Sequence, residues 1–263
     1  ISPGNILVML DDGTACEYTR TGSLVQQFHV PVVDTVGGAS QLRDAVVDGQ
    51  GLVHFFNGTF DPSLTTYDSR TASFQNHSFP EWSTDGNISH GGIGLFGETL
   101  FVTDQNTADA SGIVRFNLSD FSAGRFAEGR SYQDLSIGLD GLLYALTDSY
   151  PAGAIDVYDP VTQVLERTIS LGGDLYAADI RGIAVGADGV VYGAGWNGAI
   201  YKFGSDGTVL SSLQLAQNLI DIDISAQDEL LASDWSRNVY MATTDLAGFN
   251  RFSVTVGTAY AAH

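Results

Sequence analysis

Three segments of this chain repeat one pattern without a gap, and this repetition limits the possible folds more than any other feature. Each segment has two apolar stretches separated by a short turn rich in Asp and Gly. The segments are residues 43–54, 133–144 and 181–192. Because such turns join antiparallel strands, each segment is predicted to form a β-hairpin. A recurring supersecondary unit predicts a repeat architecture.

Each hairpin is followed by two more short apolar stretches, so the repeating unit has four strands. The third strands are predicted at residues 63–67, 153–158 and 198–203, and a fourth strand at residues 164–169. More divergent copies cover residues 91–129 and 220–256, and a sixth begins at Asn5, already in its second strand. Six copies of about 44 residues predict an all-β, six-bladed β-propeller with four antiparallel strands per blade. We expect residues 1–263 to form this single domain.

The first copy lacks an innermost strand, whereas residues 257–263 are left over at the other end of the chain. An unpaired strand edge exposes backbone donors and acceptors. We therefore expect the C-terminal segment to supply the missing strand and to close the ring.

The strand-Asp-Gly-strand repeats resemble those of six-bladed propellers in the NHL, gluconolactonase (SMP-30) and related bacterial extracellular families. The resemblance covers essentially the whole chain and implies the fold, but such propellers include lactonases, phosphotriesterases, lyases, lectins and scaffolds. The gluconolactonase-like enzymes hold one divalent cation in the central channel with a Glu, two Asn and an Asp near the starts of inner strands. The matching positions here are Arg43-Asp44, Gly91-Gly92, Gln133-Asp134, Arg181-Gly182 and Ile220-Asp221. No Glu or Asn stands at these positions, so the metal-binding residues of the gluconolactonase-like enzymes are not carried over to this chain.

The charge of the chain excludes one class of partner. It has 11 Lys and Arg against 31 Asp and Glu, a net charge of −20, so nucleic acid is not an expected partner. No apolar run of about 18 residues is present, and no membrane insertion is expected. Cys16 is the only cysteine, which excludes an intrachain disulfide and a thiolate zinc site. The acidic, lysine-poor composition favours a secreted or periplasmic bacterial protein, which we expect to be a monomer.

The two faces of the predicted ring differ in the length of their connections. One face carries short hairpin turns, whereas the other carries longer connections at residues 57–63, 81–89, 105–111, 148–152 and 172–179. Connections longer than closure requires usually carry binding and catalytic residues, so we predict the functional site on this long-loop face. Its candidate ligand-binding residues are Arg43, Asn57, Asp104, Asp148, Tyr150, Arg181, Trp196, Asn197, Asp234 and Trp235.

Three aspartates, Asp44, Asp134 and Asp221, share a repeat position in the second, fourth and sixth copies. Carboxylates about 6 Å apart would repel by about 3 kcal/mol per pair at an effective dielectric constant of about 20, and would need a cation. Oxygen ligands would favour Ca²⁺ or Mg²⁺. At about 10 Å across water the repulsion is only about 0.4 kcal/mol and no metal is required. In that alternative, the aspartates cap backbone amides of neighbouring blades or pair with arginine.

Trp196 and Trp235 share a repeat position in adjacent copies, and Tyr150 lies in a nearby loop. Exposed indoles beside Asp and Asn are typical of carbohydrate-binding surfaces, because the rings stack on the CH faces of sugars. The alternative is that both indoles pack between blades. His90 begins the third copy's inner strand and is the only histidine placed to act as an acid or base near the channel.

Three functions are compatible with these features. The first is a secreted binding or recognition module that takes a small polar ligand, most plausibly a glycan, on the long-loop face. The second is a lactonase-like, divalent-cation-dependent hydrolase or lyase, with Asp44, Asp134 and Asp221 as metal ligands and His90 as the base. The third is a protein-interaction scaffold that catalyses no reaction.

Overall fold

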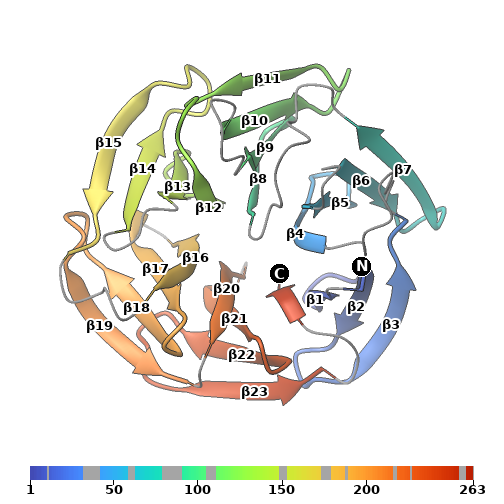
Figure 1. Cartoon of the computed structure of the whole chain (residues 1–263). Coiled ribbons are helices and arrows are strands. Elements are labelled where there is room, and N and C mark those ends of the chain that lie inside the picture. Colours follow the sequence, from blue (N-terminus) through green and yellow to red (C-terminus); the bar gives the residue numbers. More distant parts are fainter. Residues whose placement is uncertain are drawn as a thin grey trace.

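The computed structural model describes residues 1–10, 12–31, 42–58, 63–78, 91–104, 111–147, 153–172, 179–186, 189–215, 218–225, 227–254 and 259–262. Within these ranges the chain forms 24 β-strands in six antiparallel sheets of four strands each. Figure 1 shows the sheets around one axis, each running from an inner strand near the axis to an outer strand at the rim. The predicted six-bladed β-propeller is confirmed.

The blades are numbered along the chain and their strands are given from the axis outwards. Blade 1 contains β24 (Ala259–Ala262), β1 (Ile6–Leu10), β2 (Thr14–Tyr18) and β3 (Leu24–His29). Blade 2 contains β4 (Leu42–Val47), β5 (Leu52–Asn57), β6 (Ser63–Asp68) and β7 (Ser73–Ser78). Blade 3 contains β8 (Ile93–Phe96), β9 (Thr99–Asp104), β10 (Gly112–Asn117) and β11 (Ala123–Phe126).

The other three blades follow the same order. Blade 4 contains β12 (Tyr132–Ile137), β13 (Leu143–Thr147), β14 (Ala154–Tyr158) and β15 (Leu165–Ser170). Blade 5 contains β16 (Ile180–Val185), β17 (Val191–Gly195), β18 (Ala199–Phe203) and β19 (Val209–Gln214). Blade 6 contains β20 (Leu219–Ile224), β21 (Glu229–Asp234), β22 (Asn238–Thr243) and β23 (Phe249–Ser253).

The C-terminal strand closes the ring, as predicted. Strand β24 pairs antiparallel with β1, in the register Val8↔Ala262, Met9↔Ala261 and Leu10↔Ala259. It also lies beside β20 and β21 of blade 6 and β4 of blade 2. Blade 1 is therefore built from both ends of the chain.

The core lies between the blades rather than at the axis. The described residues form six apolar clusters, one at each interface between adjacent blades. Side chains alternate between the two faces of a strand. In β9, Leu100 and Val102 accordingly pack against blade 2, whereas Phe101 between them packs against blade 4. Because alternate residues of a strand pack against different neighbouring blades, both sets are apolar, which accounts for the apolar stretches of the repeat.

Aspartates shape the turns between strands. Eight of the 31 acidic residues accept the backbone amide two positions ahead, which forms the Asx turn. They are Asp12, Asp48, Asp68, Asp120, Asp140, Asp159, Asp206 and Asp245. A substantial part of the negative charge therefore has a structural role.

Candidate functional site

Part of the predicted long-loop face lies outside the described residues. This applies to His90, Asp148 and Tyr150, and to residues 59–62, 79–90, 105–110, 148–152 and 173–178 of the long connections. The roles assigned to His90, Asp148 and Tyr150 stay predictions.

Three of the predicted ligand-binding residues are fully buried at the ends of second strands. Their side chains contact the third or fourth strand of their own blade and are not exposed in this structure. The contacts are Asn57 with Ser63, Asp104 with Arg125, and Asp234 with Asn238 and Tyr240. Arg43, on β4, is also buried.

Arg181, Trp196 and Trp235 form a row across blades 5 and 6, which we call the Arg–Trp–Trp row. The guanidinium carbon of Arg181 lies 5.4 Å from the centroid of the Trp196 ring. The Trp196 and Trp235 centroids lie 6.2 Å apart, with an angle of 65° between the ring planes, an edge-to-face contact. Arg181 also forms an ion pair with Asp179. Trp196 thus packs against one side of Trp235, and the Arg181 guanidinium lies over the ring of Trp196 in a cation–π contact.

Backbone hydrogen bonds fix the two tryptophans in equivalent positions. The amide of Trp196 donates to the carbonyl of Asp179 (2.9 Å), and the amide of Trp235 donates to that of Asn218 (3.0 Å). The Asn218 amide in turn donates to the Trp196 carbonyl (2.8 Å) and joins the two blades. Asp179 and Asn218 both have positive φ, 47° and 61°, in the left-handed region that Asp and Asn tolerate best. Sequence reasoning placed Asp179 at the end of a long connection but did not predict that Asp179 and Asn218 position the indoles, although each directly precedes an aligned inner strand.

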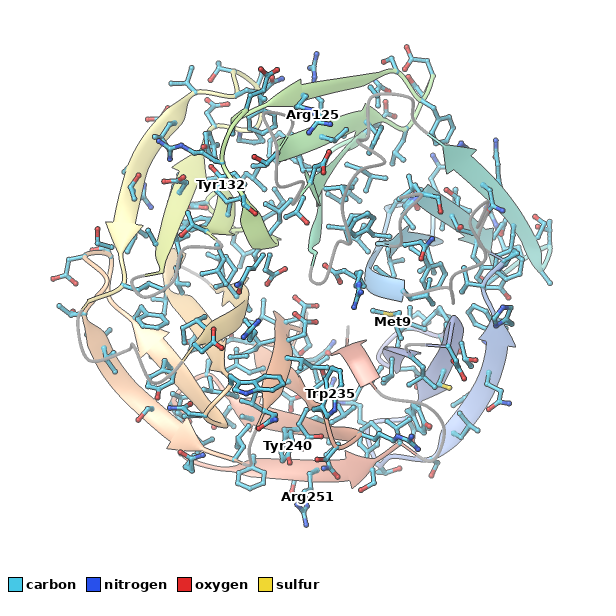
Figure 2. All side chains as sticks on the ribbon, in the orientation of Figure 1. Met9, Arg125, Tyr132, Trp235, Tyr240 and Arg251 are labelled. Atoms are coloured by element: carbon cyan, nitrogen blue, oxygen red, sulfur yellow. The ribbon has the colours of Figure 1, made fainter. Side chains whose placement is uncertain are left out.

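Short turns bring the two indoles to the surface. Each indole is the second residue of a four-residue turn whose last residue has positive φ. The closing hydrogen bonds run from Gly198 N to Gly195 O and from Arg237 N to Asp234 O. Trp196 is half-buried, whereas Trp235 is 48% exposed. Figure 2 shows Trp235 nearer the ring axis than Tyr240 and Arg251 of the same blade.

Asn197 adds an exposed amide beside Trp196. Its Nδ2 donates to the hydroxyl of Tyr201 (2.6 Å), and its Oδ1 accepts the amide of Ala199. The side chain is therefore held in one orientation at the surface. Of the predicted ligand-binding residues that the structure describes, it brings together Arg181, Trp196, Asn197 and Trp235.

Asp44 and Asp134 cap the exposed edges of inner strands. Asp44 accepts the amides of Ala45 (2.7 Å) and, in the next blade, of Ile93 (2.8 Å). Asp134 in the same way accepts the amides of Leu135 (2.8 Å) and of Ile183 in blade 5 (2.6 Å). Inner strands have no partner on the channel side, so these carboxylates satisfy donors that would otherwise be unpaired. The capping alternative is thus the arrangement observed for these two aspartates.

Glycines in the alternate blades make room for the aspartates. A Cβ atom on Gly92 would lie 2.2 Å from Asp134 Oδ1 and 2.3 Å from the amide nitrogen of Leu135. On Gly182 it would lie 2.8 Å from the Cα atom of Asp221. The alternation of Asp and Gly around the axis therefore follows from how closely the inner strands approach.

Asp44, Asp134 and Asp221 line one cavity of about 590 Å³. Burial raises the pKa of Asp134 well above its usual range, and the charges of Asp221 and Asp44 raise it further, against the two amide hydrogen bonds. Among the described residues, no group of three His, Cys, Asp or Glu side chains is placed to hold a metal ion. The predicted Ca²⁺ or Mg²⁺ therefore requires these carboxylates to move together around the ion.

Comparisons with solved structures show the fold. Selenomethionine-substituted virginiamycin B lyase from Staphylococcus aureus has a TM-score of 0.62 and 13% identity, over 96% of this chain and 85% of that chain. A catalytically inactive variant of that lyase with quinupristin has a TM-score of 0.61, with the same identity and coverage. The Dos1 propeller has a TM-score of 0.59 and 13% identity, over 98% of this chain and 70% of that chain. At this identity the likeness extends to the architecture alone.

No protein-family model and no curated protein sequence matches the chain. The resemblance to the NHL and gluconolactonase-like families is therefore not specifically confirmed. Within the described part of the chain, no helix has the length and apolar character needed to cross a bilayer.

Proposed function

We propose that this protein is a binding module that takes a glycan on the long-loop face, with Trp235 as the main stacking surface. The observation that supports this proposal is the Arg–Trp–Trp row. Trp235 is 48% exposed and is supported edge-to-face by Trp196. An indole held in one orientation loses little conformational entropy when a ligand binds.

The groups around the indoles suit a sugar ring. The face of Trp235 stacks on CH groups, while the Arg181 guanidinium donates hydrogen bonds to hydroxyl oxygens. The exposed Asn197 amide has spare capacity for hydroxyl contacts in addition to its bond to Tyr201. The combination of one aromatic platform and a few oriented polar groups is typical of carbohydrate sites.

Substitution of Trp235 by alanine is expected to weaken glycan binding by about tenfold or more, since removal of a central tryptophan commonly costs about 2 kcal/mol of binding free energy. Trp196→Ala is expected to have a smaller effect, because Trp196 is half-buried and contacts the ligand less than Trp235 does, while it orients Trp235. A glycan array identifies the ligand, and isothermal titration calorimetry then measures the affinity of each variant.

Phe249→Ala is the matched control, because Phe249 is 42% exposed on the outer strand β23 and packs against Tyr240. Its glycan affinity should equal that of the unmodified protein. The proposal is wrong if no glycan on the array binds, or if Trp235→Ala binds its glycan undiminished.

A divalent-cation-dependent hydrolase or lyase is a second proposal, supported by the three carboxylates that line one cavity. Under this proposal, dialysis against EDTA removes the ion, and Ca²⁺ or Mg²⁺ at about 100 times its dissociation constant restores about 2.7 kcal/mol of stability. For a chain of this length that is a shift of about 5–10 °C in Tm. Differential scanning calorimetry measures it. A metal-free protein whose melting is indifferent to EDTA and to both ions excludes this second proposal.

A further inference from the structure

One end of the Arg–Trp–Trp row is an ion pair. Arg181 pairs with Asp179, and both side chains are partly exposed, 22% for Arg181 and 29% for Asp179. Asp179 directly precedes β16 of blade 5 and Arg181 lies in that strand, whereas Trp235 belongs to blade 6. Trp196 contacts both Arg181 and Trp235. The row therefore has a polar end and an aromatic end, with Trp196 between them.

The ion pair is held in a fixed position relative to the indoles. The carbonyl of Asp179 accepts the amide of Trp196 (2.9 Å), which ties the backbone of the acid to the aromatic row. The guanidinium carbon of Arg181 lies 5.4 Å from the centroid of the Trp196 ring. Groups that are already ordered lose little conformational entropy when a ligand binds.

The ion pair offers donors and acceptors side by side. A guanidinium group only donates hydrogen bonds, and a carboxylate only accepts them. Adjacent hydroxyl groups of a sugar can do both, because one oxygen accepts from Arg181 while the next hydroxyl donates to Asp179. Hydrogen bonds to charged groups are stronger than those between neutral groups. The pair is therefore suited to two adjacent hydroxyl groups.

The charges at this end of the row favour a neutral ligand. The positive charge of Arg181 is balanced by that of Asp179. The carboxylate of an acidic sugar would have to displace Asp179 from Arg181. It would also have to approach a chain with a net charge of −20. An uncharged sugar avoids both costs.

The spacing along the row favours a ligand with more than one sugar unit. The Trp196 centroid lies 5.4 Å from the guanidinium carbon of Arg181 and 6.2 Å from the Trp235 centroid. A sugar ring is about as large as one aromatic ring. A single ring stacked on Trp235 therefore does not extend past Trp196 to the ion pair, whereas a second unit of the same chain does.

We propose that the long-loop face binds a neutral oligosaccharide of at least two sugar units. One ring stacks on Trp235, and adjacent hydroxyl groups of another unit bind to Arg181 and Asp179. This inference rests on the proposed glycan binding and adds a second subsite to it.

Isothermal titration calorimetry with four monosaccharides and their disaccharides tests the need for two units. The pairs are glucose and cellobiose, galactose and galactobiose, mannose and mannobiose, and N-acetylglucosamine and diacetylchitobiose. At least one disaccharide should bind about tenfold or more tightly than its monosaccharide, because it gains hydrogen bonds to two charged groups. Cellobiouronic and digalacturonic acids test the effect of charge. Both should bind at least about tenfold more weakly than the tightest neutral disaccharide.

Asp179→Asn tests the second subsite, because Asn has the same size and tolerates the positive φ of 47° at this position. It should weaken disaccharide binding about tenfold and leave monosaccharide binding unchanged. Since it removes a negative charge beside Arg181, both acidic disaccharides should bind more tightly to the variant than to the unmodified protein. A purely structural role of Asp179 does not produce this gain. Asp206→Asn, in a hairpin turn of the same blade, is the matched control and should change neither affinity.

Three results would overturn the second subsite alone and leave glycan binding standing. They are disaccharides that bind no more tightly than their monosaccharides, an acidic disaccharide that binds as tightly as the best neutral one, and equal effects of Asp179→Asn and Asp206→Asn. A glycan array on which only acidic glycans bind has the same meaning. If no sugar binds, or if Trp235→Ala binds undiminished, both the second subsite and the proposed function are wrong.

Discussion

Deletion of residues 257–263 is expected to lower Tm by at least about 6 °C. The deletion removes β24 and its three paired positions with β1. Three lost ladder hydrogen bonds at about 1 kcal/mol each correspond to about 6–12 °C for a chain of this length. Because all five residues of β1 are buried, the deletion also exposes an apolar strand edge, which adds to the loss.

Ring closure makes this one strand more important than its length suggests. Strand β24 lies beside β20, β21 and β4 in addition to its partner β1, so it joins blades 6, 1 and 2. Without it, the contacts that the described residues show between the two ends of the array are the packing of blade 6 on blade 1 and the polar contacts of Arg20 with Gln227 and Glu229. Loss of the strand should therefore lower the cooperativity of unfolding as well as Tm.

Differential scanning calorimetry of the full and shortened chains measures both effects. A synthetic peptide with the sequence of residues 257–263, added to the shortened chain, should restore part of the lost stability, and a scrambled peptide should not. An unchanged melting curve after deletion would show that closure by β24 does not stabilise the ring.

The fold was predictable because its main determinants are local. In the turn at residues 48–51, the Asp48 carboxylate accepts the amide of Gln50, and Gly51 adopts a φ of 80°. Both requirements are visible in the sequence as Asp and Gly at fixed positions. Six such units of four strands leave few alternatives to a closed ring.

The candidate site was only partly predictable because burial depends on contacts between strands. Asp234 and Trp235 were both predicted as ligand-binding residues because they lie at the end of a second strand. Asp234 is nevertheless buried against Tyr240, whereas Trp235 is exposed to solvent. Whether Asp44 binds a metal or caps an amide depends on its distance from Ile93, 49 residues away. The repeat alone does not set that distance, because it follows from how closely adjacent blades pack.

The Asp–Gly alternation shows how that packing is specified. Asp44 bonds blade 2 to blade 3, and Asp134 bonds blade 4 to blade 5. Gly92 and Gly182 allow the close approach of blade 3 to blade 4 and of blade 5 to blade 6. Hydrogen-bonded and glycine-spaced contacts thus alternate from blade 2 to blade 6, and the same contacts position Asp44, Asp134 and Asp221.

Gly92→Ala is therefore expected to destabilise the ring by about 3 kcal/mol or more, which corresponds to about 6–12 °C in Tm. Its Cβ atom would lie 2.3 Å from the backbone nitrogen of Leu135, so blades 3 and 4 must separate. Gly182→Ala should cost less, about 1–2 kcal/mol, because its nearest atom, the Asp221 Cα, is 2.8 Å away. Gly49→Ala is the matched control, since no atom lies within 4 Å of its Cβ position, and its stability should stay within about 0.5 kcal/mol.

The test is the order of the three variants in their free energy of unfolding, which urea denaturation followed by circular dichroism measures. If steric contact between inner strands sets the loss, stability falls in the order Gly49→Ala, Gly182→Ala, Gly92→Ala. Equal losses at all three positions would instead indicate a general effect of added side chains on the unfolded chain. A Gly92→Ala protein as stable as Gly49→Ala would refute the role of glycine in spacing blades 3 and 4.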